Sequence, residues 1–150
     1  MIRFRLEPLR KYRKLQEDIL ERALAETRRQ LDGAKGKLAD CRHSYGEAAR
    51  QFQQKQARGK LSAAAAEVHS VYLAQLEDVM RRQKKDIENI RQQIRQKRGQ
   101  LLDAVKNRKM LDKLKEKQQQ RVIEAMHRSE RHFFDDVATN TFIRKSSPNE

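Results

Sequence analysis

The sequence predicts an all-α protein: a long antiparallel two-helix coiled-coil hairpin whose second helix overhangs the first at its C-terminal end. Three observations predict this fold. The only two prolines, Pro8 and Pro148, lie near the ends, so the interior lacks the residue that breaks helices. The composition, with 37% charged residues, five glycines and no tryptophan, lacks the turn residues and aromatics of a compact globular core. Two heptad patterns of apolar residues flank a short segment that contains glycine.

The first predicted helix spans about residues 3–57. Its apolar and small residues follow alternating steps of four and three, which is the seam of a coiled coil. The seam consists of Leu20, Leu24, Thr27, Leu31, Ala34, Leu38, Cys41, Tyr45, Ala48 and Phe52. Such a face must pack against a second helix to leave water.

A turn is predicted at about residues 59–62. Gly59 can adopt the left-handed conformation that ends a helix, and the Ser62 hydroxyl can accept a hydrogen bond from a first-turn amide of the next helix. The segment Gly59-Lys60-Leu61-Ser62 is not a phosphate-binding loop, because it lacks the upstream glycine, the adjacent Lys-Ser/Thr pair and the preceding strand.

The second predicted helix spans about residues 62–138. Its seam runs through Leu73, Leu76, Met80, Ile87, Ile90, Ile94, Leu101 and Ala104. A short turn makes the helices antiparallel, so the residue number on one helix falls as that of the facing residue rises. The two numbers of each facing pair should therefore add up to a constant, and a total of about 121 fits both seams. This register opposes Leu20 to Leu101, Thr27 to Ile94, Leu31 to Ile90, Ala34 to Ile87, Cys41 to Met80, Tyr45 to Leu76 and Ala48 to Leu73. The agreement favours an intramolecular hairpin over a parallel dimer.

Acid-first pairs at i,i+4 spacing should add weak support to both helices. These pairs are Glu7/Lys11, Asp18/Arg22, Glu77/Arg81, Asp78/Arg82 and Glu124/Arg128.

The register leaves the second helix without a partner from about Gln118 onward. This part still carries Val122, Ile123, Met126, Phe133, Phe134 and Val137, which an isolated helix would leave in water. A partner protein is the natural cover for such a surface. Residues 139–150 are expected to fray, and residues 1–150 are expected to form a single coiled-coil domain.

The net charge of +14 is uneven, with fifteen Lys and Arg against five Asp and Glu between Arg81 and Arg121. Such a field attracts acidic proteins, nucleic acid or anionic lipid without distinguishing them. A basic coiled-coil adaptor that binds nucleic acid is therefore the alternative function, although the aromatics needed for base stacking are missing. A single cysteine, no long apolar run and no secretory signal at the start predict a cytoplasmic protein.

No residues form a catalytic, cofactor or metal site by their spacing. Glu124 and His127 stand one turn apart, as in metal-binding pairs, but the further carboxylates of a di-metal bundle are absent. Cys41 lies on the seam, where a small apolar role fits better than reactivity. His43, His69 and His132 fit ordinary surface or seam-edge positions. The sequence predicts a protein that is not an enzyme, needs no cofactor or metal, and acts by binding other proteins.

Four stretches resemble the FliJ family of bacterial flagellar export proteins: FRLEPLRKYRKLQEDILERALAE at 4–26, VYLAQLEDV at 71–79, KNRKMLDKLKEKQQQ at 106–120 and EAMHRSERHFFDDVATNTFIRK at 124–145. The resemblance spans nearly the whole chain. It is most specific near the C-terminus, where the run KLKEK at 113–117, Glu124, Glu130 and the pair Asp135-Asp136 match the family pattern in order and spacing. The family commonly has Glu at the second position of that pair.

The resemblance implies a component of the type III export apparatus, similar in shape to the central stalk of rotary ATPases. It implies that the end with both termini enters the pore of the hexameric export ATPase and promotes ring assembly, and that the protein couples this ATPase to the transmembrane export gate. It also implies an escort role for export chaperones and substrates, at a cytoplasmic site held to the inner membrane through partners at the flagellar base. Whether a flagellum or a related injectisome is served stays open.

The resemblance also implies two sets of contact residues. When the Leu-Glu step of the family is matched to Leu76-Glu77, the gate-contacting stripe falls on Tyr72, Leu76, Val79 and Gln83. The family prefers His at the last of these positions, and the predicted register places Leu76 opposite Tyr45. Position along the chain assigns ATPase binding to Leu6, Leu9, Arg10, Arg13, Lys117, Arg121, Glu130 and Asp135.

Overall fold

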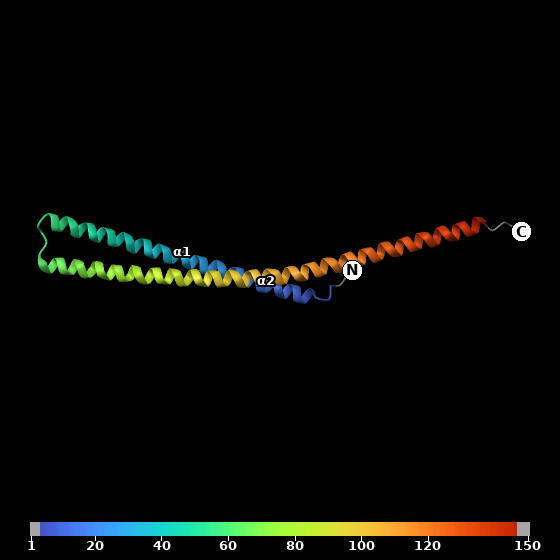
Figure 1. Cartoon of the computed structure of the whole chain (residues 1–150), viewed down its shortest axis with the longest axis horizontal. Helices are drawn as coiled ribbons and strands as arrows, with labels where there is room; N and C mark the ends of the chain where they lie inside the picture. Colours follow the sequence, from blue (N-terminus) through green and yellow to red (C-terminus); the bar gives the residue numbers. More distant parts are fainter. Residues whose placement is uncertain (1–3, 147–150) are drawn as a thin grey trace. The chain divides into compact units, whose positions relative to one another are not determined.

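The computed structural model describes residues 4–146, which form two helices, α1 at Glu7–Ala57 and α2 at Ala63–Ser146, and no strand (Figure 1). Contacts within the chain divide it into two units. We call residues 17–103 the hairpin unit, and residues 4–16 with 104–146 the terminal unit. The fold prediction, an all-α hairpin, is confirmed, whereas a single domain over the whole chain stays a prediction.

In the hairpin unit, α1 and α2 lie side by side and antiparallel, joined by the turn (Figure 1). The rings of Phe52 and His69 are 5.6 Å apart, and the Tyr45 hydroxyl donates to Glu77 at 2.9 Å. In each pair the two residue numbers add up to within one of 121, the total that the predicted register requires of facing residues. No seam residue predicted in this unit is exposed, and the most buried apolar side chains are those of Leu24, Leu38 and Ile87.

One layer of the hairpin seam is polar. Thr27 is only 1% exposed, and its hydroxyl donates to the Ala23 carbonyl at 2.9 Å. The same oxygen accepts a hydrogen bond from the Lys97 ammonium at 2.6 Å. Lys97 therefore crosses the seam to reach a position that the heptad pattern assigns to an apolar contact.

The turn has the predicted caps. Gly59 has φ of 64°, the left-handed conformation that glycine adopts without steric cost. The Lys60 amide donates to the Lys55 carbonyl and the Gly59 amide to the Gln56 carbonyl, the two bonds of a Schellman motif. The Ser62 side-chain oxygen accepts from the Ala65 amide at 3.2 Å, which caps the start of α2.

In the terminal unit, the first turns of α1 pack against α2, and Phe4, Ala104 and Leu111 are buried there. Burial along α2 ends at Val122, and every residue from Ile123 to Ser146 is exposed. We call residues 123–146 the overhang. It begins a few residues after Gln118, where the sequence predicted that the partner would end.

The helix ends differ from the predicted ones. α1 begins at Glu7 instead of about residue 3, because Pro8 favours the first turn of a helix. α2 continues to Ser146 instead of ending near 138 and fraying from 139. Neither proline nor glycine interrupts this stretch, the hydroxyls of Thr139 and Thr141 bond to carbonyls one turn earlier, and Arg144 and Lys145 complement the helix dipole. Residues 1–3 and 147–150 lie outside the described residues.

Within residues 4–146, neither helix has a stretch that combines the length and the apolar character needed to span a membrane.

Candidate protein-binding surfaces

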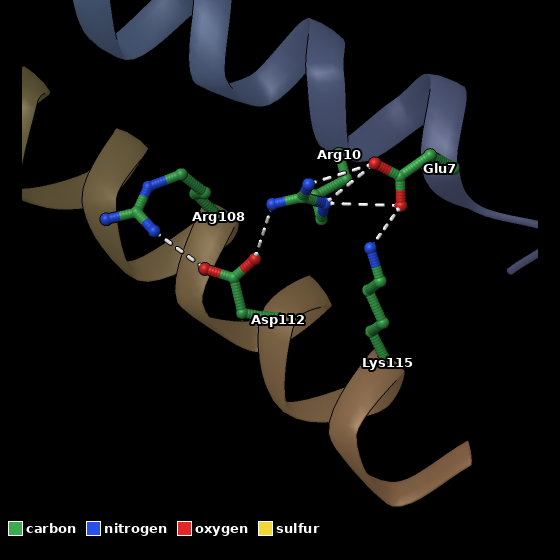
Figure 2. Close-up of polar contacts among 5 residues, drawn as sticks. All are labelled: Glu7, Arg10, Arg108, Asp112 and Lys115. Atoms are coloured by element: carbon green, nitrogen blue, oxygen red, sulfur yellow. Dashed lines mark hydrogen bonds and ion pairs between the residues drawn. The ribbon is translucent and has the colours of Figure 1, made fainter. Parts of the chain in front are cut away.

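A polar cluster joins α1 to α2 in the terminal unit (Figure 2). Arg10 donates to Glu7 at 2.9 Å and to Asp112 at 3.2 Å. Lys115 donates to the other Glu7 oxygen at 2.9 Å, and Arg108 donates to the other Asp112 oxygen at 2.6 Å. Each carboxylate therefore accepts from both a guanidinium and a second cation, and each helix supplies both charges.

Hydrogen bonds from Arg10 and then from Lys115 lower the pKa of Glu7 from 4.5 to about 2. The hydrogen bonds to Glu7 and Asp112 in turn raise the pKa of Arg10. Both shifts favour the charged forms of Glu7 and Arg10, and the hydrogen bonds of the cluster hold the first turn of α1 on α2. Arg10, assigned above to ATPase binding, already has two partners within its own chain.

An apolar groove lies beside this cluster, with a volume of about 660 Å³. Its lining consists of Phe4, Arg5, Leu6, Leu114, Lys117, Gln118 and Arg121. Phe4 is buried, whereas Leu6 and Leu114 stay partly exposed at its surface. The groove therefore combines an apolar floor with three cations and includes no acidic residue among those described.

The overhang presents a broad apolar surface. Phe133 and Phe134 are 65% and 68% exposed, and their rings meet edge to face at 6.1 Å. Further exposed apolar side chains are those of Ile123, Met126, Val137, Phe142 and Ile143. Helical spacing places Glu130 among them, and its carboxylate lies 3.4 Å from the His127 ring. This surface can bind another protein through apolar contact, with the Glu130 carboxylate among the apolar side chains.

A second exposed apolar surface lies in the hairpin unit, near the start of α2. Of the four residues assigned to the gate, Tyr72 and Val79 are exposed, by 46% and 41%, whereas Leu76 and Gln83 are half-buried. Val68 and Val71 are exposed beside Tyr72. A shallow hollow here is lined by Ala64, Glu67, Val68, Val71, Tyr72 and Gln75. We call Val68, Val71, Tyr72 and Val79 the exposed stripe.

Two contacts from α1 hold the part of α2 next to this stripe, one at its backbone and one at a side chain. The Cys41 thiol donates to the Leu76 carbonyl at 3.7 Å, and the Tyr45 hydroxyl donates to Glu77. The Glu77 carboxylate raises the pKa of Tyr45. Leu76 therefore lies at the seam, where its carbonyl accepts from Cys41, as well as near the stripe. Cys41 is half-buried at the same seam.

The structure separates the residues assigned to ATPase binding into three groups. Leu6, Lys117 and Arg121 line the groove, and Glu130 and Asp135 lie on the overhang, at least nine residues or roughly 14 Å further along the helix. Leu9 is exposed on α1, where Arg10 belongs to the polar cluster and Arg13 donates to Gln16 at 3.2 Å.

Sequence reasoning missed several residues of these surfaces, namely Phe4, Arg5, Leu114 and Gln118 in the groove, Val68 and Val71 in the exposed stripe, and Phe142 and Ile143 on the overhang. Their only sequence signal is helical spacing from residues already assigned, such as Leu114 three positions before Lys117. Among the described residues, no group of three or more His, Cys, Asp and Glu side chains could hold a metal ion.

Comparison with known proteins gives one match. The model of a family described as the flagellar FliJ protein matches residues 2–147. Searches of curated proteins and of solved structures found no match.

Proposed function

The chain belongs to the flagellar FliJ protein family and is thus a component of the flagellar export apparatus, and we propose that it links two partners of that apparatus. The terminal unit binds a hexameric export ATPase and promotes its assembly, and the exposed stripe contacts the transmembrane export gate. The protein acts by binding and not by catalysis, escorts export chaperones or substrates, and stays at the inner membrane through its partners.

The observation that carries this proposal is the overhang. Every residue from Ile123 to Ser146 is exposed, although this stretch includes three phenylalanines, a valine, a methionine and two isoleucines. In proteins most helical stability comes from the packing of an apolar face against other elements, and no described residue packs on this stretch. A partner that covers this apolar surface would stabilise the helix and gain burial of roughly 25 cal/mol per Å².

Deleting residues 123–150 tests the ATPase contact. The deletion removes the whole overhang but leaves α1 and its packing against α2 up to Val122. We expect co-sedimentation with the hexameric ATPase to be lost, while circular dichroism shows the helicity of the remaining chain. Undiminished co-sedimentation of the shortened chain would contradict the proposal.

The gate contact is tested by Tyr72→Ala combined with Val79→Ala. Both side chains are exposed, so helicity should be unchanged while affinity for the gate falls roughly tenfold or more. Leu102→Ala is the matched control, because Leu102 is also exposed in the hairpin unit and lies outside the stripe. A loss of helicity in the double variant would show that these side chains serve the core instead.

Nucleic acid binding is the alternative that the basic segment suggests. Its affinity should fall steeply and linearly in a double-logarithmic plot against salt, whereas an apolar protein contact is much less sensitive. A salt titration with duplex and single-stranded oligonucleotides separates the two functions.

A further inference from the structure

The groove of the terminal unit has a composition that selects a particular kind of ligand. Its floor is apolar, formed by Phe4, Leu6 and Leu114. Its rim carries Arg5, Lys117 and Arg121, all three exposed. Gln118 adds an amide to the lining and has a partner within the chain.

The three rim cations are uncompensated within residues 4–146. None of their side chains makes an ion pair or hydrogen bond there. The two acids of the neighbouring polar cluster are already used, since Glu7 accepts from Arg10 and Lys115, and Asp112 accepts from Arg10 and Arg108. An apolar hollow is therefore surrounded by positive charge that the described chain does not neutralise.

We infer that the groove binds an acidic amphipathic helix of the partner protein, in which a bulky apolar side chain is flanked by carboxylates one helical turn away. The apolar side chain would cover Leu6 and Leu114, and the carboxylates would accept hydrogen bonds from Lys117 and Arg121. As a contact with the ATPase, this inference rests on the proposed function and specifies the chemistry of the partner segment.

The groove fits a protein segment better than a membrane or a nucleic acid. Helices that bind membranes present a convex apolar face with basic residues along several turns. Here the apolar atoms lie in a localised hollow between α2 and the segment that precedes α1, and they suit a single inserted side chain. Nucleic acid would satisfy the cations but would leave the floor exposed, because no aromatic side chain is exposed there for base stacking.

The test uses the full chain and a fluorescein-labelled helical peptide with leucines on one face and glutamates beside them. We expect saturable binding by anisotropy, which is lost when the glutamates become glutamines or the leucines become serines. Lys117→Glu with Arg121→Glu should weaken binding about tenfold or more, because charge reversal adds repulsion. Lys106→Glu with Lys109→Glu is the matched control: it changes the charge equally on the same helix, at exposed positions outside the groove.

Three results would overturn the inference: equal binding of the glutamine peptide, equal weakening by the control pair, or binding of phosphatidylglycerol vesicles but not of the peptide. The experiment is separable from the deletion of the overhang. If deletion of the overhang abolishes ATPase binding while the Lys117/Arg121 variant still binds the ATPase, the groove is not an ATPase contact, but the proposed overhang contact stands. Peptide binding that needs Lys117 and Arg121, together with full ATPase binding by the deleted chain, would refute the proposed overhang contact alone.

Discussion

Replacing Thr27 with valine should destabilise the hairpin unit, although the two side chains have nearly the same size. The Thr27 hydroxyl is buried at the seam, where it donates to the Ala23 carbonyl and accepts from the Lys97 ammonium at 2.6 Å. Valine removes the acceptor and leaves the ammonium beside an apolar wall. The substitution therefore measures whether the polar layer stabilises the fold.

The expected magnitude follows from two opposing terms. A hydrogen bond to a charged group contributes about 1.5–3 kcal/mol. The methyl group that replaces the hydroxyl regains about 0.8 kcal/mol of apolar burial. The net loss in the free energy of unfolding is then about 1–2 kcal/mol. Lys97 is half-buried and can turn toward water, which favours the lower end of that range.

Urea unfolding followed by helical circular dichroism measures this loss in Thr27→Val, Lys97→Met and the double variant. The cycle should show coupling of about 1 kcal/mol between the two positions. Thr141→Val is the control, because Thr141 makes the same bond to a carbonyl one turn earlier but is exposed and contacts no lysine. A Thr27→Val chain that is more stable than the wild type, or a cycle without coupling, would refute the reasoning.

Glu7→Gln should lower the Tm of the full chain above about pH 5, and most of this effect should be lost by pH 2. The folded pKa of about 2 lies below the ordinary 4.5, so the stabilisation is complete above the unfolded pKa and is lost as pH falls through the folded one. Thermal melts across pH measure this, with the exposed Glu21→Gln as control; a difference as large at pH 2 as at pH 7 would contradict it. Gly59→Ala should cost about 1 kcal/mol in urea unfolding, because φ of 64° is strained for alanine; an unchanged midpoint would show that the turn tolerates a side chain.

The helical pairing could be predicted because heptad spacing is a local property of the sequence. Each seam residue identifies its own helix face, and the short turn at Gly59 then fixes the register for the rest. The pairs formed by Phe52 with His69 and by Tyr45 with Glu77 agree with that register. The overhang followed from the same arithmetic, because a helix longer than its partner must leave apolar positions uncovered.

The polar contacts could not be predicted in the same way. The i,i+4 rule paired Glu7 with Lys11, but Glu7 instead accepts from Arg10 and from Lys115, which is distant in the sequence. Glu77 likewise accepts from Tyr45 and not from Arg81. Long side chains have several acceptors within reach, and the choice depends on rotamers and on the opposite helix. The groove was missed for the same reason.

The terminal unit contains two kinds of surface because α1 begins near Glu7 while the apolar pattern of α2 continues. Where α1 is present, its first turn and Phe4 cover the α2 seam, and Arg10 and Lys115 neutralise the carboxylates of the joint. The cations that line the groove beyond that joint form no ion pair within residues 4–146, so the groove is positive. Past Val122 the seam residues have no helix opposite them, so the overhang is apolar. A single partner that covers both must therefore supply an acidic helix for the groove and apolar surface for the overhang, and shortening α2 or reversing the rim charges removes these contacts separately.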